Sequence, residues 1–290
     1  MIGSALTPFL QRDGHEVVKL QRGRERPDPH LPSWEPADRK ISLAGAGPFD
    51  AVIHLAGETI AQRWTATSKA RIRDSRVKGT EFLSAFLAGL AERPKVFIAA
   101  SAIGFYGNRG DEVVAEDSAP GSGFLAEVCK EWEDATRPAS ESGIRVVNLR
   151  LGIVLDSRGG ALGKMLRPFR AGLGGRLGSG RQYWSWIAID DLLAVFRRAL
   201  IDSSLRGPVN AVSPHPVTNA EFTHTLGLVL RRPTFFNVPA FGVKLLFGEM
   251  GETALLASTR VRPARLEQIG FVFQFPKLEA ALRHMLRPRE

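Results

Sequence analysis

Two hydroxyl side chains follow an apolar segment and are suited to proton transfer. Ser101 comes directly after Lys95–Ala100, and Tyr106 lies a few residues further along the same loop. A serine hydroxyl can hydrogen-bond a carbonyl or hydroxyl of a substrate, and a tyrosine hydroxyl can act as a general acid or base. Ser101 is equally suited to capping a loop. We therefore treat Ser101 and Tyr106 as the candidate catalytic residues, with Tyr106 as the proton donor.

One arginine is placed to bind a phosphate. Arg22 and the preceding Gln21 follow Glu16–Leu20, which reads as a strand. In dinucleotide-binding folds an acidic residue at this place bonds the ribose hydroxyls of NAD, whereas an arginine accommodates the 2′-phosphate of NADP. A solvated surface arginine is the alternative interpretation. If the surrounding elements form such a fold, Arg22 predicts NADP as the cofactor.

Strand-like and helix-like segments alternate along the first half of the chain, which predicts parallel strands joined by right-handed crossovers. Ala51–Leu55 is almost entirely apolar, as a strand covered on both faces must be. A Pro-rich loop is expected from Arg22 to about Pro48. The expected elements are a helix over 2–12, strands over 16–20, 51–55, 95–100 and 145–150, a long helix carrying Leu83 to Leu90, and a helix over 124–142. The fold class is therefore α/β, with a doubly wound parallel sheet of the Rossmann type.

The pattern loosens after Leu155. A glycine-rich stretch is interrupted by a short helix over 165–170, and Asp190 or Asp191 can cap a helix that runs to Leu200. A strand over 208–212 and a last helix over 276–286 follow. We predict a dinucleotide-binding domain made of 1–156 and 183–214, and a smaller mixed C-terminal domain made of 157–182 and 215–290.

The composition is typical of a globular protein, with 290 residues of which 44% are hydrophobic and 24% charged. Cys129 is the only cysteine, which excludes an internal disulfide and a cysteine-based metal site and suits a reducing cytoplasm. The apolar run Phe97–Phe105 is too short to span a bilayer, and no export signal is recognisable. We expect a cytoplasmic protein without a membrane span or a metal.

Basic residues outnumber acidic ones, with 39 Lys and Arg against 30 Asp and Glu. Such a balance can attract nucleic acid, but the arginines are scattered and no basic tract or nucleic-acid-binding motif accompanies them. We expect no nucleic-acid partner. Within the glycine-rich segment, Arg176 or Arg181 could contact a phosphate or carboxylate as part of a lid, and a flexible structural loop is the alternative.

Short motifs are spread over nearly the whole chain. They are Ile2-Gly3-Ser4-Ala5-Leu6, Gly14-His15-Glu16-Val17, His54-Leu55-Ala56-Gly57-Glu58, Arg63-Trp64, Ser75-Arg76-Val77, Gly79-Thr80, Gly172-Leu173-Gly174-Gly175, Gly178-Ser179-Gly180-Arg181-Gln182, Trp186-Ile187 and Asp190-Asp191-Leu192. With these motifs the chain resembles the epimerase-family branch of the extended short-chain dehydrogenase/reductases, the group that carries a C-terminal domain of unknown function. Together the motifs are specific, whereas each one alone is weak.

The resemblance implies an NADP site. Gln21 and Arg22 would meet the adenosine phosphate, Leu55 and Ala56 the adenine and ribose side, and Arg76 would lie near the cofactor. A small residue lets the backbone approach the ligand closely. The remaining implied contact positions are Ile2, Gly3, Gly57, Arg71 and Val154.

The resemblance also implies a strand and a Gly-rich turn directly before Ile2, since the pyrophosphate of a dinucleotide sits at the start of the first helix. In the printed sequence this first strand is missing, and Gly3 stands where the last glycine of the turn is expected. A coding sequence that starts further upstream is one explanation, and a truncated chain that binds the cofactor poorly is the other.

Enzymes of the superfamily that this chain resembles use Ser, Tyr and Lys. The lysine lies four residues after the tyrosine and lowers the pKa of the tyrosine. Ser101 matches the serine. The two tyrosines, Tyr106 and Tyr183, are not followed by a lysine at that spacing, and the helix that should carry the pair has Phe124 and Val128 instead. Neither of these side chains can transfer a proton.

Two functions remain open. The first is an NADP-dependent oxidoreductase or epimerase acting on a small hydroxylated or sugar-like metabolite between the two domains, as a possible homodimer. The second is a non-catalytic NADPH-sensing or interaction protein with a cell-division-related role, which suits the absence of the Tyr-Lys pair.

Overall fold

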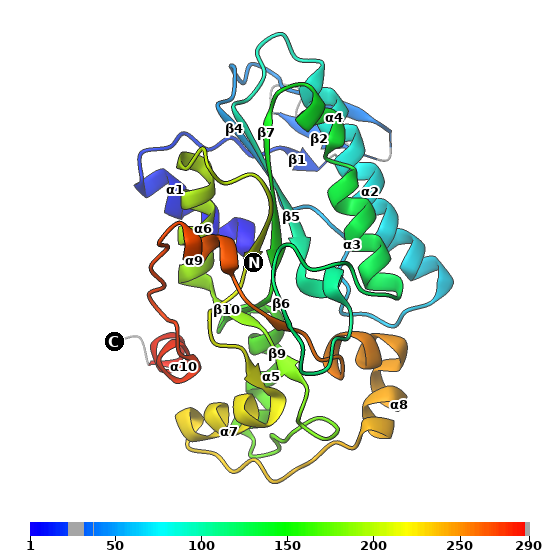
Figure 1. The fold of residues 1–290 in the computed structure, drawn as a ribbon, viewed down its shortest axis with the longest axis vertical. Coiled ribbons are helices and arrows are strands. Elements are labelled where there is room, and N and C mark those ends of the chain that lie inside the picture. The colour runs from blue at the N-terminus through cyan, green and yellow to red at the C-terminus, as the bar shows by residue number, and fades with distance from the viewer. Residues whose placement is uncertain (23–31, 37, 288–290) are drawn as a thin grey trace.

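A four-stranded parallel sheet forms the centre of the computed structural model, which describes residues 1–22, 32–36 and 38–287 (Figure 1). The strand order is β11-β7-β5-β4, and the bounds are β4 Ala51–His54, β5 Val96–Ala102, β7 Arg145–Leu151 and β11 Gly207–Ala211. The long ladder between β5 and β7 pairs Val96 with Arg145 and Ser101 with Arg150. The doubly wound α/β fold is thus confirmed, and every carboxyl end of this sheet lies at one edge.

Helices cover both faces of the sheet (Figure 1). One face carries α2 (Ala66–Ala88), α3 (Phe124–Asp134) and α4 (Arg137–Glu141), and the other carries α1 (Ile2–Arg12), α6 (Ile189–Ile201) and α9 (Ala264–Gln268). Neighbouring residues of β5 serve different cores, because Phe97 packs with Leu83 of α2 and Ile98 with Leu192 of α6. A strand buried on both sides therefore has to be apolar along most of its length, as residues 96–100 are.

A second core lies beyond the sheet and is built around Trp186, Phe222 and Leu162. Its elements are β8 (Ile153–Asp156) paired with β10 (Trp186–Ala188), β9 (Tyr183–Trp184) paired with β12 (Val217–Thr218), and the helices α5 (Gly160–Arg170), α7 (Asn219–Leu230) and α10 (Leu278–Leu286). Further along come α8 (Ala240–Met250), a π-helical turn over Gly251–Leu255, and β13 (Arg260–Val261). β13 pairs with β6 (Val113–Val114), so the C-terminal segment returns to the first half of the chain.

The N-terminal segment differs from its prediction. The predicted strand over 16–20 is not formed, and pairing begins only at β1, Gln21–Arg22. The predicted loop to Pro48 contains two short strands, β2 (Ser33–Glu35) and β3 (Lys40–Ser42), while residues 23–31 and 37 lie outside the described part. These strands are too short to show an alternating pattern, and they are held by tertiary burial of Trp34, which is 7% exposed.

The predicted helix over 124–142 is two helices. α3 ends at Asp134 and α4 starts at Arg137, with Pro138 in the first turn of α4. Proline has no N–H to donate to the preceding turn, so it is tolerated there and interrupts a continuous helix. The short helix expected over 165–170 begins earlier, at Gly160.

The two acids at the start of α6 do not cap it. The N-cap is Ala188, without a side-chain hydrogen bond. Asp191 is 2% exposed and instead accepts hydrogen bonds from the backbone amides of Gln274 and Phe275, at 2.7 and 3.0 Å. Asp191 thereby ties the C-terminal segment to the dinucleotide part.

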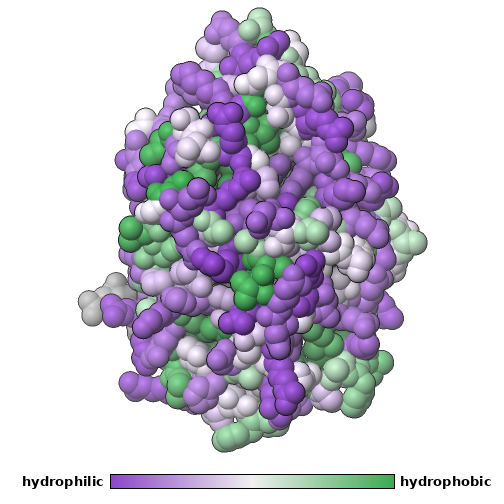
Figure 2. Space-filling model, viewed as in Figure 1, coloured by the Kyte–Doolittle hydropathy of each residue, from purple (hydrophilic) through white to green (hydrophobic). Residues whose placement is uncertain are grey.

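Exposed apolar side chains gather on and before α8. Phe241 and Leu245 are 73% and 79% exposed, and apolar surface is visible at the lower right of Figure 2, where Figure 1 places α8. Among the described residues, no helix combines the length and the apolar character needed to cross a membrane.

Candidate cofactor and catalytic site

The start of α1 meets the carboxyl end of β4. A Cβ atom on Gly3 would lie 3.8 Å from Cδ1 of Leu55, and Ile2, Leu55 and Val154 all border the same core cluster. The N-cap of α1, Met1, makes no side-chain hydrogen bond. Backbone N–H groups in the first turn of a helix have no partner within the helix, and they favour an anion. The structure thus brings four of the predicted cofactor residues to one place.

Arg76 is fixed directly behind Gly57. Its Nη1 donates to the carbonyl oxygens of Glu58 at 2.9 Å and Ile72 at 3.1 Å, and Cζ lies 3.2 Å from where a Cβ of Gly57 would be. Burial lowers the pKa of Arg76 from its ordinary value. The indole of Trp132 lies 5.0 Å away, which supports the planar guanidinium from the α3 side. A Cβ at position 57 would press on this guanidinium, which would have to shift by a few tenths of an ångström.

The other predicted cofactor residues are more exposed. Arg71 lies on the surface of α2, where Nη2 donates to Gln62 at 3.4 Å, and Gln62 donates in turn to the carboxylate of Glu58 at 3.3 Å. Arg71 is therefore linked to the loop that Arg76 holds. Gln21 is exposed in β1, and the side chain of Arg22 lies outside the described part.

The residues gathered here fit a phosphate-bearing dinucleotide. An uncapped helix start and a half-buried guanidinium are both groups that bind anions, and Gly57 keeps the strand end open. The described ranges contain no group of three His, Cys, Asp or Glu side chains placed to hold a metal ion.

Ser101 and Tyr106 belong to one buried network at the carboxyl ends of β5 and β7. Oγ of Ser101 donates to Glu133 at 2.7 Å, and Arg150 donates to both oxygens of Glu133 at 2.8 Å. Nη1 of Arg150 also donates to the hydroxyl of Tyr106 at 2.9 Å, which donates to Oδ1 of Asn210 at 2.7 Å. The structure thus joins the two candidate catalytic residues through an ion pair.

Both hydroxyls of this network are enclosed. Tyr106 is 0% exposed and Ser101 2% exposed. Burial raises the pKa of Tyr106. Burial opposes the charge of Arg150, but the hydrogen bonds and charge of Glu133 outweigh it and raise the pKa of that guanidinium. The catalytic roles stay predictions, and the visible role of Tyr106 is to position Arg150.

Phe124 and Val128 fill the positions where the resemblance expects the Tyr-Lys pair. Phe124 opens α3 against Trp64, with ring centroids 5.1 Å apart, and Val128 is buried. Nζ of Lys69 lies 4.6 Å from the centre of the Phe124 ring and 2.7 Å from Oε1 of Glu249 in α8. An ammonium group from α2 therefore stands beside the aromatic ring.

The sequence interpretation missed Glu133, Asn210 and Lys69, and counted Arg150 only among the scattered arginines. A signal existed for Arg150, because a charge within the apolar strand 145–150 has to find a buried partner. Glu133 could then have been sought on the preceding helix. Lys69 and Asn210 gave no such signal, since their neighbours come from distant parts of the chain.

Comparison with known proteins identifies the family. Residues 1–210 match the model of the NAD dependent epimerase/dehydratase family, and residues 238–285 match a domain of unknown function. An epimerase family protein of Mycobacterium bovis is 44% identical over 97% of this chain and 93% of its own, and the human epimerase family protein SDR39U1 is 36% identical over 98% and 96%.

A solved structure agrees with these relatives. The crystal structure of human SDR39U1 (isoform 2) with NADPH matches with a TM-score of 0.88 and 35% identity, covering 98% of this chain and 95% of that one. The resemblance drawn from the motifs is thereby confirmed. The chain belongs to the NAD dependent epimerase/dehydratase family.

Proposed function

We propose that this protein binds NADPH and acts as an oxidoreductase or epimerase on a small hydroxylated or sugar-like metabolite. The human relative was crystallised with NADPH, and the residues at the start of α1 and behind Gly57 suit a phosphate-bearing ligand. The observation that carries the enzymatic part is the Ser101–Glu133–Arg150 network at the carboxyl edge of the sheet. Burying an ion pair costs free energy, and such clusters concentrate at functional sites.

The side chains of the two sites have separate roles in this function. A bound nicotinamide would exchange a hydride with the substrate. Arg76 binds and orients the cofactor, and Ser101 hydrogen-bonds the substrate oxygen by turning Oγ away from Glu133. Arg150 holds the carboxylate of Glu133 in place, because the guanidinium donates one hydrogen bond to each of its oxygens at 2.8 Å. Tyr106 holds Arg150 in place.

A turnover assay with a matched serine control tests this function. The protein is mixed with NADPH and a panel of aldehydes, ketones and keto sugars, and oxidation is followed by nicotinamide absorbance. We expect Ser101→Ala to lower kcat by about tenfold or more with little change in NADPH affinity. Ser203→Ala, at an exposed position, should leave kcat unchanged. Equal activity of all three proteins would remove Ser101 from the mechanism.

The non-catalytic NADPH-sensing or interaction role is the second candidate. It is favoured by the apolar pair Phe124 and Val128 and by the enclosure of Tyr106, since none of these presents a proton donor to a ligand. Saturable NADPH binding combined with an unchanged absorbance for every substrate would support this role over the enzyme.

We further propose a cytoplasmic location and a homodimer. The single cysteine, Cys129, is buried, and burial raises its pKa to about 12, so it is an unreactive thiol that suits a reducing compartment. A relative in Arabidopsis thaliana is named chloroplastic, so fractionation of the source cell is the appropriate test of location. Sedimentation equilibrium tests the homodimer, and a single species with the mass of one chain would overturn it.

A further inference from the structure

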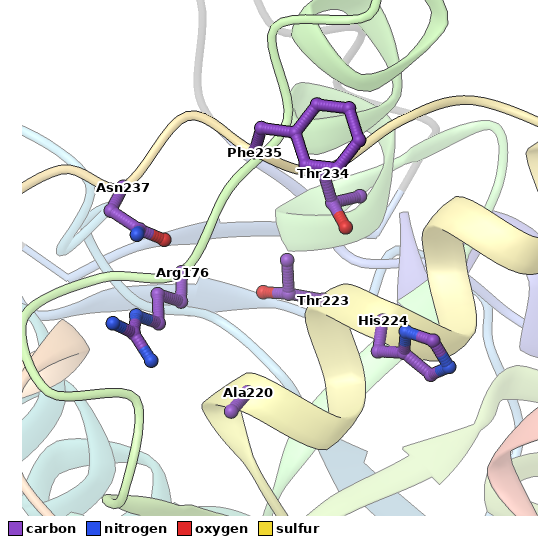
Figure 3. A pocket seen from close by; sticks show the side chains of 7 residues that line it. All are labelled: Arg176, Ala220, Thr223, His224, Thr234, Phe235 and Asn237. Atoms are coloured by element: carbon purple, nitrogen blue, oxygen red, sulfur yellow. The ribbon is translucent and has the colours of Figure 1, made fainter.

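A hollow with mixed polar and apolar walls lies outside the cofactor site, between the start of α7, the glycine-rich segment and the chain after α7 (Figure 3). Its volume is about 330 Å³, close to the lower end of pockets that hold small ligands. The side chains of Arg176, Thr223 and Asn237 surround it in Figure 3. The lining residues are Arg176, Ala220, Thr223, His224, Thr234, Phe235 and Asn237.

The lining has a positive charge and no negative one. Within the described ranges Arg176 forms no ion pair, and none of the residues around the hollow is acidic. Thr223 is only 5% exposed, and its hydroxyl makes no hydrogen bond to another described residue. Hydroxyl and amide groups of Thr234 and Asn237 add further donors. A guanidinium surrounded by such donors is the chemistry that binds phosphate and carboxylate groups.

Backbone contacts hold the walls of the hollow together. The amide of Val238 donates to the carbonyl oxygen of Arg176 at 2.9 Å, and the amide of Leu177 donates to Oδ1 of the buried Asn219 in α7 at 2.8 Å. Gly227 lets the chain after α7 approach closely, since a Cβ there would lie 2.5 Å from Cγ2 of Thr234. The donors are therefore presented from connected elements, which limits the ordering cost of binding.

We propose that this hollow is a second ligand site, which binds a small molecule through a phosphate or carboxylate group. The guanidinium of Arg176 binds the anionic group, and the hydroxyl of Thr223 donates a hydrogen bond to the same anionic group from the base of the hollow. Phe235, 83% exposed at the rim, covers the apolar part of the molecule. No residue of this site belongs to the segments expected to hold NADP, so it goes beyond the proposed function.

Calorimetric titrations with inorganic phosphate and with citrate, at constant ionic strength, test the site. We expect saturable binding of at least one probe, weakened roughly tenfold or more by Arg176→Gln and also weakened by Thr223→Val. Phosphate binding alone identifies a phosphate ester as the ligand class, and citrate binding alone identifies a carboxylate. Thr223→Val keeps the shape of the side chain and removes only the hydroxyl.

Two control variants separate this site from other cations. Arg181→Gln removes the same charge from the same glycine-rich segment but does not line the hollow, and Arg22→Ala removes the arginine predicted to bind the cofactor phosphate. Both should leave probe binding unchanged. Absence of binding by the unaltered protein, or an equal loss in Arg181→Gln and Arg176→Gln, would overturn the proposal. A loss confined to Arg22→Ala would assign the anion to the cofactor site instead.

Discussion

At the scale of single residues, the ion pair between Arg150 and Glu133 places two buried charges at the candidate catalytic site. Their side chains are 4% and 12% exposed, and both carboxylate oxygens of Glu133 accept from the guanidinium. A buried pair of this kind adds little net stability, because desolvation offsets the attraction. Removing one partner of the pair is strongly destabilising, since the other charge is then left buried without a partner.

Replacing Glu133 with Gln should therefore destabilise the protein by about 3–5 kcal/mol. The free energy of unfolding in urea measures the effect. Glu131→Gln is the matched control. Glu131 lies on the exposed side of the same helix, α3, and its Oε2 is 2.6 Å from Nε of Arg73 in α2. The control should unfold almost as the unaltered protein does, and equal losses in both variants would contradict this account of the network.

The predicted phosphate contact of Arg22 also belongs to the residue scale. Arg22→Ala should weaken NADPH binding by about tenfold or more while changing NADH binding little, since only NADPH carries the 2′-phosphate. Fluorescence titration of both cofactors measures this, with NADH as the internal control. Equal losses for the two cofactors would remove the assignment.

At the scale of elements, Gly152 forms the tight connection between β7 and β8. A Cβ at this position would lie 2.7 Å from the carbonyl oxygen of Ser185 and 2.8 Å from Cγ1 of Val212. That carbonyl already accepts from the amide of Ile153, so it cannot move freely. The glycine is required by close packing on the chain that leads into β10.

Gly152→Ala should lower the free energy of unfolding by about 1–3 kcal/mol, the range for overpacking in a well-packed region. Thermal or urea unfolding gives the value. Gly47→Ala is a suitable control, because no atom lies within 4 Å of its Cβ position. A variant at Gly152 as stable as the control would show that the connection can relax.

Elements with strong local patterns could be predicted from the sequence, and elements defined by distant partners could not. β4, β5 and β7 appear at or close to their predicted places because each carries a run of apolar residues that packs between the helices on both faces of the sheet. The expected strand over 16–20 is equally apolar in part, yet it finds no neighbouring strand among the described residues and does not form. A strand forms only when it hydrogen-bonds to a neighbouring strand, and the local sequence does not show whether such a neighbour exists.

At the scale of the whole molecule, the C-terminal segment crosses between the two parts of the chain. β13 pairs with β6, and Phe271 and Phe273 pack onto the core around α6. The sequence placed this segment in a separate small domain, a division that stays a prediction. Lys69 and Glu249 likewise join α2 to α8 across 180 positions of sequence. Such contacts carry no local signal, so Lys69 and Asn210 could not be found from the sequence. Of the second ligand site, the sequence indicated only Arg176, as a candidate contact for a phosphate or carboxylate.

Acid stability provides a test at this scale, because His54 is buried at the end of β4. It is 3% exposed, its Nε2 has no hydrogen-bond partner in the described part of the chain, and Trp34 lies edge-on at 5.2 Å. Burial lowers its pKa from 6.5 to about 4. The folded protein thus holds His54 neutral, whereas the unfolded chain takes up a proton below its ordinary pKa of 6.5.

The stabilising contribution of a neutral His54 is fully present above the unfolded pKa and is lost as pH falls toward the folded pKa. The loss through this window should be about 3 kcal/mol, from a difference between the pKa of 6.5 and the pKa of about 4. Urea unfolding at several pH values measures it. His54→Leu should flatten this part of the profile, whereas His224→Gln, at an exposed position, should keep it. A profile for His54→Leu that falls as steeply as that of the unaltered protein would place the acid sensitivity in other groups, and the carboxylates would then account for it.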